Sequence, residues 1–250
     1  MKKLLATLSF FTRLPFWRLA SIPADKYKNV VDLWPAAGIL TGGLTALFLW
    51  GASFIVAPYA AVALAMSFRA LLTGAFHEDG LADFFDGMGG GSSRSRILEI
   101  MKDSHIGSYG VIALILYYIL TIAFISSLPI AIACLAIFAS DPWSKFCGSF
   151  IINILPYARN EEQAKNKLIY NRMGAFTVVI CFLLGFLPML FLPRLYWACA
   201  FLPFIVGMAL ILLMKRKIGG YTGDCCGATA LLCELSFYLS AAVVYHISIS

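Results

Sequence analysis

Charged residues are scarce in this chain of 250 residues, at 13% of the sequence, whereas a soluble domain contains about 25%. Hydrophobic residues make up 61%, and the mean hydropathy is +0.85. This composition excludes an ordinary soluble enzyme and indicates an integral membrane protein. The net charge of +6 is therefore not a sign of nucleic-acid binding, because basic residues in membrane proteins typically mark the cytoplasmic loops.

Other features are lacking as well. The seven cysteines contain no CxxC spacing, which gives no support for a zinc site or a disulfide framework. We expect no cleaved signal peptide, because the apolar run Leu4–Phe11 is short and Arg13 interrupts it. The start of the chain is instead predicted to be a retained amphipathic helix. With no visible repeat or soluble domain, residues 1–250 are predicted to form a single membrane-embedded domain.

Seven apolar runs come close to the roughly 20 residues that a helix needs to cross a bilayer. We therefore predict an all-α, polytopic membrane bundle with about seven transmembrane helices, within a range of six to eight. The second run carries Arg69, and the fourth contains Asp141, Pro142 and Lys145. The predicted spans are Leu33–Ala57, Ala60–Phe76, Tyr109–Leu128, Pro129–Leu155, Gly174–Leu192, Leu195–Met214 and Ala228–Ile249.

The basic residues predict the orientation of these spans. Sixteen of the 19 lysines and arginines fall in four connecting segments, residues 1–32, 77–106, 156–173 and 215–225. With seven alternating spans and a cytoplasmic N-terminus, all four segments lie on the cytoplasmic side, as the positive-inside rule requires. We expect a multi-pass protein of the cytoplasmic (inner) membrane whose functional face is cytoplasmic.

Acidic residues concentrate in one stretch, from His77 to Asp103, which holds six of the 13 in the chain. Asp79, Asp83 and Asp86 are spaced i, i+4, i+7, so they share one face of a helix. Glu99 and Asp103 repeat the i, i+4 spacing after a glycine-rich segment. The pattern predicts two helical segments whose acidic faces fold toward each other across a glycine hinge.

Carboxylates on one face repel one another unless a cation lies between them. Mg²⁺ prefers oxygen ligands and is often held by a few carboxylates together with substrate phosphates. We therefore interpret the stretch as a magnesium and phosphate site, with Arg94, Arg96 and Lys102 as phosphate partners. The simpler alternative is a solvated acidic loop between membrane spans.

Three further places carry polar residues. Asp141 and Lys145 are four apart on one helical face inside a span, where they form either a neutralising ion pair or, through Lys145, a phosphate contact. In Gly219–Asp224, the backbone of Gly220 and Gly223 together with Thr222 and Asp224 could contact a phosphate or a metal. Glu234 lies in the last predicted span and needs a partner there.

The order and spacing of three blocks identify a resemblance. FTRLP near the N-terminus, FHEDGLADFFDG running to RILEIMKDSHIGSYG, and GGYTGD near the end together resemble the cobalamin synthase family, the adenosylcobinamide-GDP ribazoletransferases. The resemblance covers essentially the whole chain. It implies the final step of vitamin B12 nucleotide-loop assembly, in which a hydroxyl of α-ribazole or its 5′-phosphate attacks adenosylcobinamide-GDP, GMP leaves, and adenosylcobalamin or its phosphate forms.

The resemblance also suggests roles for the residues above. The expected metal ligands are Asp79, Asp83, Asp86, Glu99 and Asp103, with Mg²⁺ as cofactor. The expected catalytic groups are Asp83, Asp86 and His77, because a carboxylate or an imidazole must accept the proton of the attacking hydroxyl. The expected substrate contacts are Arg13, Arg96, Lys102, Lys145, Gly220, Thr222, Gly223 and Asp224. The lipid bilayer, further copies of the chain and other corrinoid-pathway membrane enzymes are expected partners.

Two other functions fit part of the pattern. CDP-alcohol phosphatidyltransferases also hold metal with aspartates on membrane helices, but their D-x2-D-G-x2-A-R signature differs from the D-x3-D-x2-D-G of this chain. A cation-coupled transporter would place its acidic residues near the bilayer midplane, often on paired broken helices. Here they cluster at the predicted cytoplasmic edge, and the sequence shows no repeat.

Overall fold

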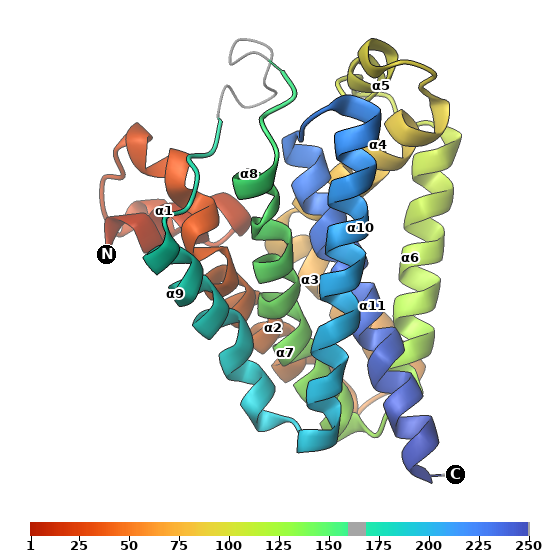
Figure 1. Cartoon of the computed structure of the whole chain (residues 1–250). Helices are drawn as coiled ribbons and strands as arrows, with labels where there is room; N and C mark the ends of the chain where they lie inside the picture. The colour runs from red at the N-terminus through yellow and green to blue at the C-terminus, as the bar shows by residue number, and fades with distance from the viewer. Residues whose placement is uncertain (160–168, 250) are drawn as a thin grey trace.

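The computed structural model describes residues 1–159 and 169–249. Within these residues the fold is helical and contains no named strand, since Tyr157 and Tyr221 form only an isolated bridge. This confirms the predicted all-α class. Figure 1 shows long helices running between two ends of a bundle, with the C-terminus at the lower end.

All seven predicted apolar runs form helices, although not all of them are simple spans. Five continuous helical stretches of the described residues are long and apolar enough to cross a membrane. A sixth candidate is a pair of helices joined at a sharp bend, and Ala175–Phe191 is a shorter apolar helix. The five stretches are Ala24–Ala52, Ser108–Ser126, Ile130–Ile154, Arg194–Ile218 and Gly223–Ile249.

The elements follow one another closely along the chain. They are α1 (Lys2–Phe11), η1 (Phe16–Arg18), η2 (Ala24–Leu33), α2 (Trp34–Ala52), α3 (Pro58–Thr73), α4 (Phe76–Gly90), α5 (Arg94–Ile100), α6 (Ser108–Ser126), α7 (Ile130–Ser149), α8 (Ile151–Ile154), α9 (Ala175–Phe186), η4 (Leu187–Phe191), η5 (Arg194–Ala200), α10 (Phe201–Ile218) and α11 (Gly223–Ile249). The predicted N-terminal helix is α1, and it packs on η2, where Lys3 pairs with Asp32.

The bend between α3 and α4 is 93°, and the backbone at two residues explains it. Gly74 and Ala75 both adopt left-handed conformations, with φ of 71° and 54°. Glycine tolerates this region at little cost, whereas alanine does not. The chain therefore leaves α3 at nearly a right angle, and α4 does not continue along the direction of α3.

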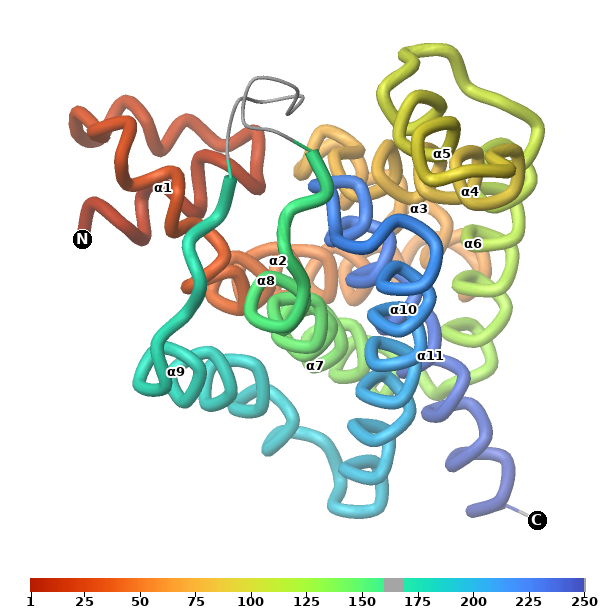
Figure 2. The backbone as a smooth tube through the Cα atoms, turned by 45° about the horizontal axis from the view of Figure 1, so that its top comes forward, coloured from red at the N-terminus to blue at the C-terminus, as the bar shows by residue number. Residues whose placement is uncertain are grey.

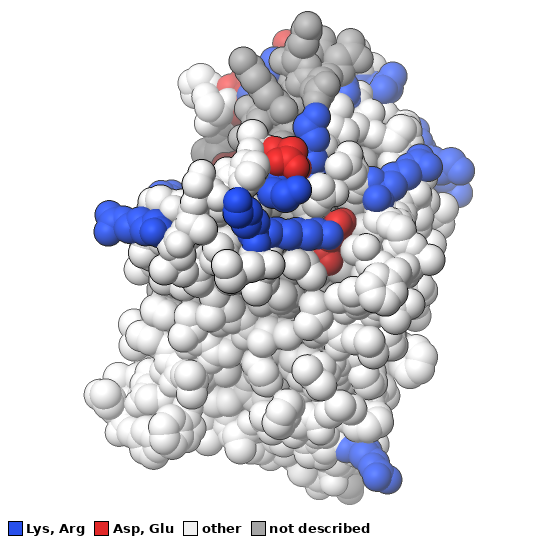
Figure 3. All heavy atoms as spheres, turned by 90° about the vertical axis from the view of Figure 1, so that its left-hand side faces the viewer, with Lys and Arg blue, Asp and Glu red and all other residues white. Residues whose placement is uncertain are grey.

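The predicted basic segments lie at one end of the molecule. The N-terminal segment, α5, the α10–α11 turn and the chain that leaves α8 all lie toward the upper end in Figure 1, and Figure 2 shows α4 beside α5 there. On the face in Figure 3, most charged side chains gather in the upper part, above a broad surface that is uncharged apart from a basic side chain at its lower edge. This surface suits lipid, and the charged end suits water. Part of the predicted segment 156–173, namely residues 160–168, lies outside the described residues.

The helices α2 and α7 pack closely on each other through glycines of α2. A Cβ atom added to Gly38 would lie 2.6 Å from the Cα atom of Pro142, and one added to Gly42 would lie 2.9 Å from the Cβ atom of Asp141. Small residues let membrane helices approach each other in this way. The contact matters for the site because it fixes the buried part of α7 that carries Asp141 and Lys145.

Replacing Gly38 by alanine is expected to destabilise the bundle by about 1–3 kcal/mol, because the backbone of α7 must move to make room. The measurement is thermal unfolding of the detergent-purified protein. Gly51→Ala is the matched control on the same helix, since a Cβ atom there meets nothing within 4 Å. It should leave stability unchanged or raise it, because alanine is the better helix former. Equal stability of the two variants would contradict the packing argument.

Candidate active site

The helix α4 carries three of the predicted site carboxylates. Asp79 is exposed, whereas Asp83 and Asp86 are 9% and 7% exposed. All three lie on one helix, as the i, i+4, i+7 spacing predicts. Their surroundings differ, however, and so do the roles open to them.

Asp86 is engaged by the start of α6. Its two carboxylate oxygens accept hydrogen bonds from the backbone N–H groups of Gly107 at 2.7 Å and Gly110 at 2.8 Å. Both glycines press so closely on Asp86 that a Cβ atom at either would clash with the carboxylate. Asp86 therefore satisfies N–H groups that have no partner within α6 itself. This geometry explains the GSYG segment and gives Asp86 a positioning role.

The second acidic group lies on and after α5. This helix packs on α4 through apolar contacts, with Met101 and the backbone of Ile97 against Gly87. Glu99 pairs with Arg96 at 2.9 Å, and both side chains are mostly exposed. The two helical segments therefore meet, but through apolar residues and not through the acidic faces that the spacing predicts.

Asp103 follows α5 in an exposed turn. Its Oδ1 accepts the backbone N–H of His105 at 3.0 Å and lies 2.7 Å from Nδ1 of the same histidine. These hydrogen bonds, the backbone one foremost, hold the pKa of the Asp103 carboxyl below its usual value. The neighbouring Lys102 is also exposed. Both residues lie in water at the charged end of the molecule.

The GGYTGD loop lies against the chain that leaves α8. The N–H of Ala158 donates to the carbonyl of Tyr221 at 2.8 Å, and the N–H of Tyr221 donates to Pro156 at 3.0 Å. A Cβ atom on Gly220 would lie 2.5 Å from the Pro156 carbonyl oxygen, so only glycine fits there. Gly223 has open space around it. Of the two predicted phosphate-contacting glycines, Gly220 is thus explained by chain packing, and Gly223 stays a prediction.

Thr222 and Asp224 begin α11, directly beside α4. Thr222 is fully buried, and its hydroxyl lies 3.2 Å from Asp224 Oδ2 and 3.4 Å from the Cys225 amide nitrogen, as in an N-terminal cap. A Cβ atom on Gly80 of α4 would lie 3.0 Å from the carbonyl oxygen of Asp224. The structure therefore brings the backbone of Asp224 next to the turn of α4 between Asp79 and Asp83, as its predicted contact with a phosphate or a metal requires.

The FTRLP segment reaches the same region from the N-terminal side. The backbone N–H of Arg13 donates to the Leu72 carbonyl at 2.8 Å. The Arg13 guanidinium lies against Gly74, at the bend before α4. Arg13 is exposed, so its charge is available near the start of the acidic helix, which is consistent with its predicted phosphate contact.

His77 lies inside the bundle, away from solvent. Its side chain is 4% exposed and stacks between Phe11 and Trp34, at centroid distances of 5.8 and 5.6 Å. Its Nε2 has no hydrogen-bond partner among the described residues. The ring lines a small cavity that also contacts Glu78 and Lys145 and has room for about one water molecule.

Lys145, a predicted phosphate contact, pairs with Asp141 on the same face of α7. Asp141 also accepts a hydrogen bond from the Thr41 hydroxyl of α2 at 2.7 Å. Lys145 is 6% exposed. The neutralising ion pair that the spacing predicts is therefore confirmed, and a phosphate role for Lys145 would require its amine to leave this pair.

Glu234, which is expected to need a partner within the bundle, forms a buried ion pair with Arg69 of α3. Tyr117 of α6 donates to Glu234 Oε2 at 3.0 Å, and Tyr238 donates to Oε1 at 2.7 Å. Arg69 also lies 3.9 Å from Glu78. This network connects α3, α4, α6 and α11 inside the bundle.

The helix α4 carries carboxylates, the donor type that Mg²⁺ prefers. Asp79, Asp83 and Asp224 are carboxylates near Gly80. Asp224 accepts a hydrogen bond from the Thr222 hydroxyl, and Asp86 and Asp103 likewise accept hydrogen bonds from neighbouring groups. No cluster of three or more His, Cys, Asp or Glu side chains suited to a metal occurs in residues 1–159 and 169–249. Substrate phosphates and water would therefore complete the coordination, as is common for Mg²⁺.

Several residues of this region were not among the predicted site residues. Tyr117, Tyr238 and Thr41 give no sign of their role in sequence, because tyrosine and threonine are ordinary in apolar helices. Arg69 and Glu234 did give a signal, since two opposite charges within spans are expected to find partners. The sequence alone does not say which charges pair.

Comparison with known proteins agrees with the resemblance. The family model described as cobalamin-5-phosphate synthase matches residues 3–242. An adenosylcobinamide-GDP ribazoletransferase of Shewanella sp. (strain W3-18-1) is 36% identical over 245 residues, which cover 96% of this chain and 93% of the relative. That of Shewanella baltica (strain OS185) is 36% identical over 248 residues, covering 97% and 94%. No solved structure matches the chain. On this evidence, the chain belongs to the cobalamin-5-phosphate synthase family.

Proposed function

We propose that this protein joins adenosylcobinamide-GDP to α-ribazole or α-ribazole 5′-phosphate, with release of GMP. The observation that carries the proposal is the match of nearly the whole chain to the family and to relatives named for this reaction. The acidic helix α4, next to Asp224 at the charged end of the bundle, supports it. The D-x3-D-x2-D-G spacing gives no support to the CDP-alcohol phosphatidyltransferase alternative, and the position of α4 gives none to a transporter.

The proposed reaction is a phosphoryl transfer. A hydroxyl of the acceptor forms a bond to the phosphorus on the cobinamide side, the bond from that phosphorus to the bridging oxygen breaks, and GMP leaves with the electron pair. A bound Mg²⁺ would neutralise charge on the pyrophosphate. Asp79, Asp83 and Asp224 are assigned to hold that ion. Arg13, Arg96 and Lys102 are assigned to phosphate groups of the substrates, because they are exposed cations at this end.

The acceptor hydroxyl must lose a proton during the transfer. His77 is buried between two aromatic rings, which argues against direct contact with the acceptor. We therefore assign the proton to a carboxylate of α4, with Asp83 as the first candidate. Asp86 is assigned to positioning, because its hydrogen bonds hold the start of α6 against α4.

The proposal includes a location and partners. The distribution of basic segments supports a site on the cytoplasmic face of the inner membrane, where nucleotides are found. Association with further copies of the chain, or with other membrane enzymes of corrinoid synthesis, stays a prediction.

The test is an assay on detergent-purified protein with adenosylcobinamide-GDP and α-ribazole, with products identified by mass spectrometry. We expect equal amounts of cobalamin and GMP in the presence of Mg²⁺. Removing the metal with a chelator should reduce the rate to background, and adding Mg²⁺ back should restore it, because the paired phosphates need charge neutralisation.

Two results would contradict parts of this proposal. Folded, Mg²⁺-supplied protein that forms neither product would overturn the reaction. A rate that is unchanged by the chelator would support the proposed reaction but contradict the proposed role of Mg²⁺. A chelated sample that elutes from a sizing column as before controls for loss of fold.

A further inference from the structure

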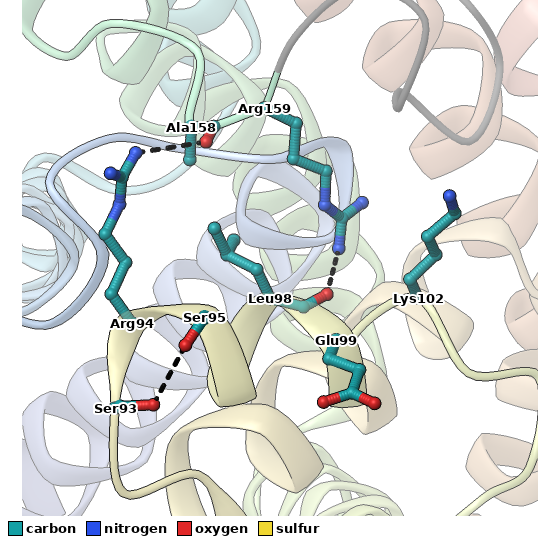
Figure 4. Close-up of a pocket in the computed structure, with 8 residues that line it drawn as sticks. All are labelled: Ser93, Arg94, Ser95, Leu98, Glu99, Lys102, Ala158 and Arg159. Atoms are coloured by element: carbon teal, nitrogen blue, oxygen red, sulfur yellow. Dashed lines mark hydrogen bonds between the residues drawn. The ribbon is translucent and has the colours of Figure 1, made fainter.

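A second polar site lies apart from the carboxylates of α4. A pocket of about 730 Å³ opens between α5 and the chain that leaves α8, and its size suits a small ligand. Figure 4 shows its lining, which consists of Ser93, Arg94, Ser95, Leu98, Glu99, Lys102, Ala158 and Arg159. Of these residues, Arg94, Glu99 and Lys102 belong to the predicted site, whereas Arg159 does not.

The charges of this pocket favour an anion. Three cations, Arg94, Lys102 and Arg159, line it together with one carboxylate, Glu99. Glu99 is already paired with Arg96 at 2.9 Å, and its carboxylate points away from the Arg159 guanidinium in Figure 4. The pocket therefore keeps a net positive charge. The Ser93 and Ser95 hydroxyls also line it and form a hydrogen bond with each other at 3.1 Å.

Arg159 is held in place for such a ligand. It is 8% exposed, and its Nη2 donates to the Leu98 carbonyl at 2.8 Å. A guanidinium has five N–H donors in a rigid fork, and Arg159 lines the pocket wall. Arg94 is fixed in the same manner, since it donates to the carbonyls of Ile218 at 2.7 Å and Ala158 at 3.2 Å.

We propose that this pocket is a phosphate subsite, in which Arg159, Lys102 and Arg94 bind the phosphate monoester of a nucleotide. Arginine forks match phosphate oxygens in pairs, and such charge-assisted bonds are the strong ones. Leu98 offers an apolar wall beside the cations for a sugar or base. The inference rests on the proposed function, which provides two ligands of this chemistry: the 5′-phosphate of the acceptor and the phosphate of GMP.

Arg159→Gln tests the subsite, because it removes the charge while keeping a polar side chain. KM is measured separately for α-ribazole and α-ribazole 5′-phosphate, and GMP binding is measured by equilibrium dialysis, which needs no turnover. We expect either KM for α-ribazole 5′-phosphate or the dissociation constant of GMP, or both, to rise about tenfold, because one charge-assisted interaction is lost. KM for unphosphorylated α-ribazole should stay the same.

The two sources of phosphate give different results. Weaker binding of α-ribazole 5′-phosphate alone assigns the pocket to the acceptor, and weaker binding of GMP alone assigns it to the leaving nucleotide. Unchanged constants for both ligands in a folded variant would overturn the subsite. If wild-type protein forms no cobalamin, the proposed function fails, and the dialysis with GMP still tests the pocket.

Two further variants complete the experiment. Lys102→Gln serves if Arg159→Gln does not fold, because Lys102 is exposed and makes no hydrogen bond or ion pair with the part of the chain described here. Arg216→Gln is the matched control, since Arg216 is an exposed cation in the last turn of α10 and does not line the pocket. An equal effect of Arg216→Gln would indicate general electrostatic attraction and overturn the subsite.

Discussion

Asp83→Asn is expected to abolish turnover while leaving the protein folded. The substitution keeps the shape of the side chain, but it removes the negative charge that we assign to holding the metal and accepting the proton. Losing about 4 kcal/mol of transition-state stabilisation corresponds to about a thousandfold lower kcat. The measurement is the formation of cobalamin and GMP at saturating Mg²⁺, together with elution of the variant from a sizing column.

The control must lose the same charge elsewhere. Asp25→Asn does so, because Asp25 is exposed and pairs only with its neighbour Lys26 among the described residues. This control should keep wild-type activity. If the Asp83→Asn protein retained most of its activity, Asp83 would neither hold the metal nor accept the proton. Asp79 and Asp224 would then be the next carboxylates to replace.

Most of the fold follows from the pattern of apolar residues. All seven predicted spans are helical, and the basic segments lie at one end, because long apolar runs must satisfy their backbone as helices in lipid. The exception is the second run. Gly74 and Ala75 turn the chain by 93° before α4, and no hydropathy pattern reveals two consecutive left-handed residues, one of which is not glycine.

The candidate site was predictable in part. The i, i+4, i+7 spacing correctly placed Asp79, Asp83 and Asp86 on one helix, since helical periodicity depends on local sequence alone. It could not reveal that Asp86 accepts the N–H groups of Gly107 and Gly110, which depends on the packing of α6. Nor could it tell that Thr222 caps α11, because a TGD sequence suits a cap and a phosphate loop equally well.

The second large effect is expected from the buried network below the site. Arg69→Met should destabilise the protein by about 3–5 kcal/mol, the cost of leaving a buried charge without its partner. Three carboxylates and two cations line the same cavity, namely Glu78, Asp141, Glu234, Arg69 and Lys145. Without Arg69, three negative charges would face only Lys145. The measurement is the unfolding of detergent-purified protein by heat or denaturant.

A matched variant and a double variant make the argument specific. Arg96→Met breaks an ion pair whose side chains are 55% and 69% exposed, and it should cost no more than about 1 kcal/mol. Arg69→Met combined with Glu234→Leu should be more stable than Arg69→Met alone, because it removes both members of the pair. If Arg69→Met proved as stable as Arg96→Met, the carboxylates would have to be neutralised by some other means. A double variant no more stable than Arg69→Met would point instead to Glu78, the second carboxylate beside Arg69, or to the hydroxyls of Tyr117 and Tyr238, which lose Glu234 as their acceptor.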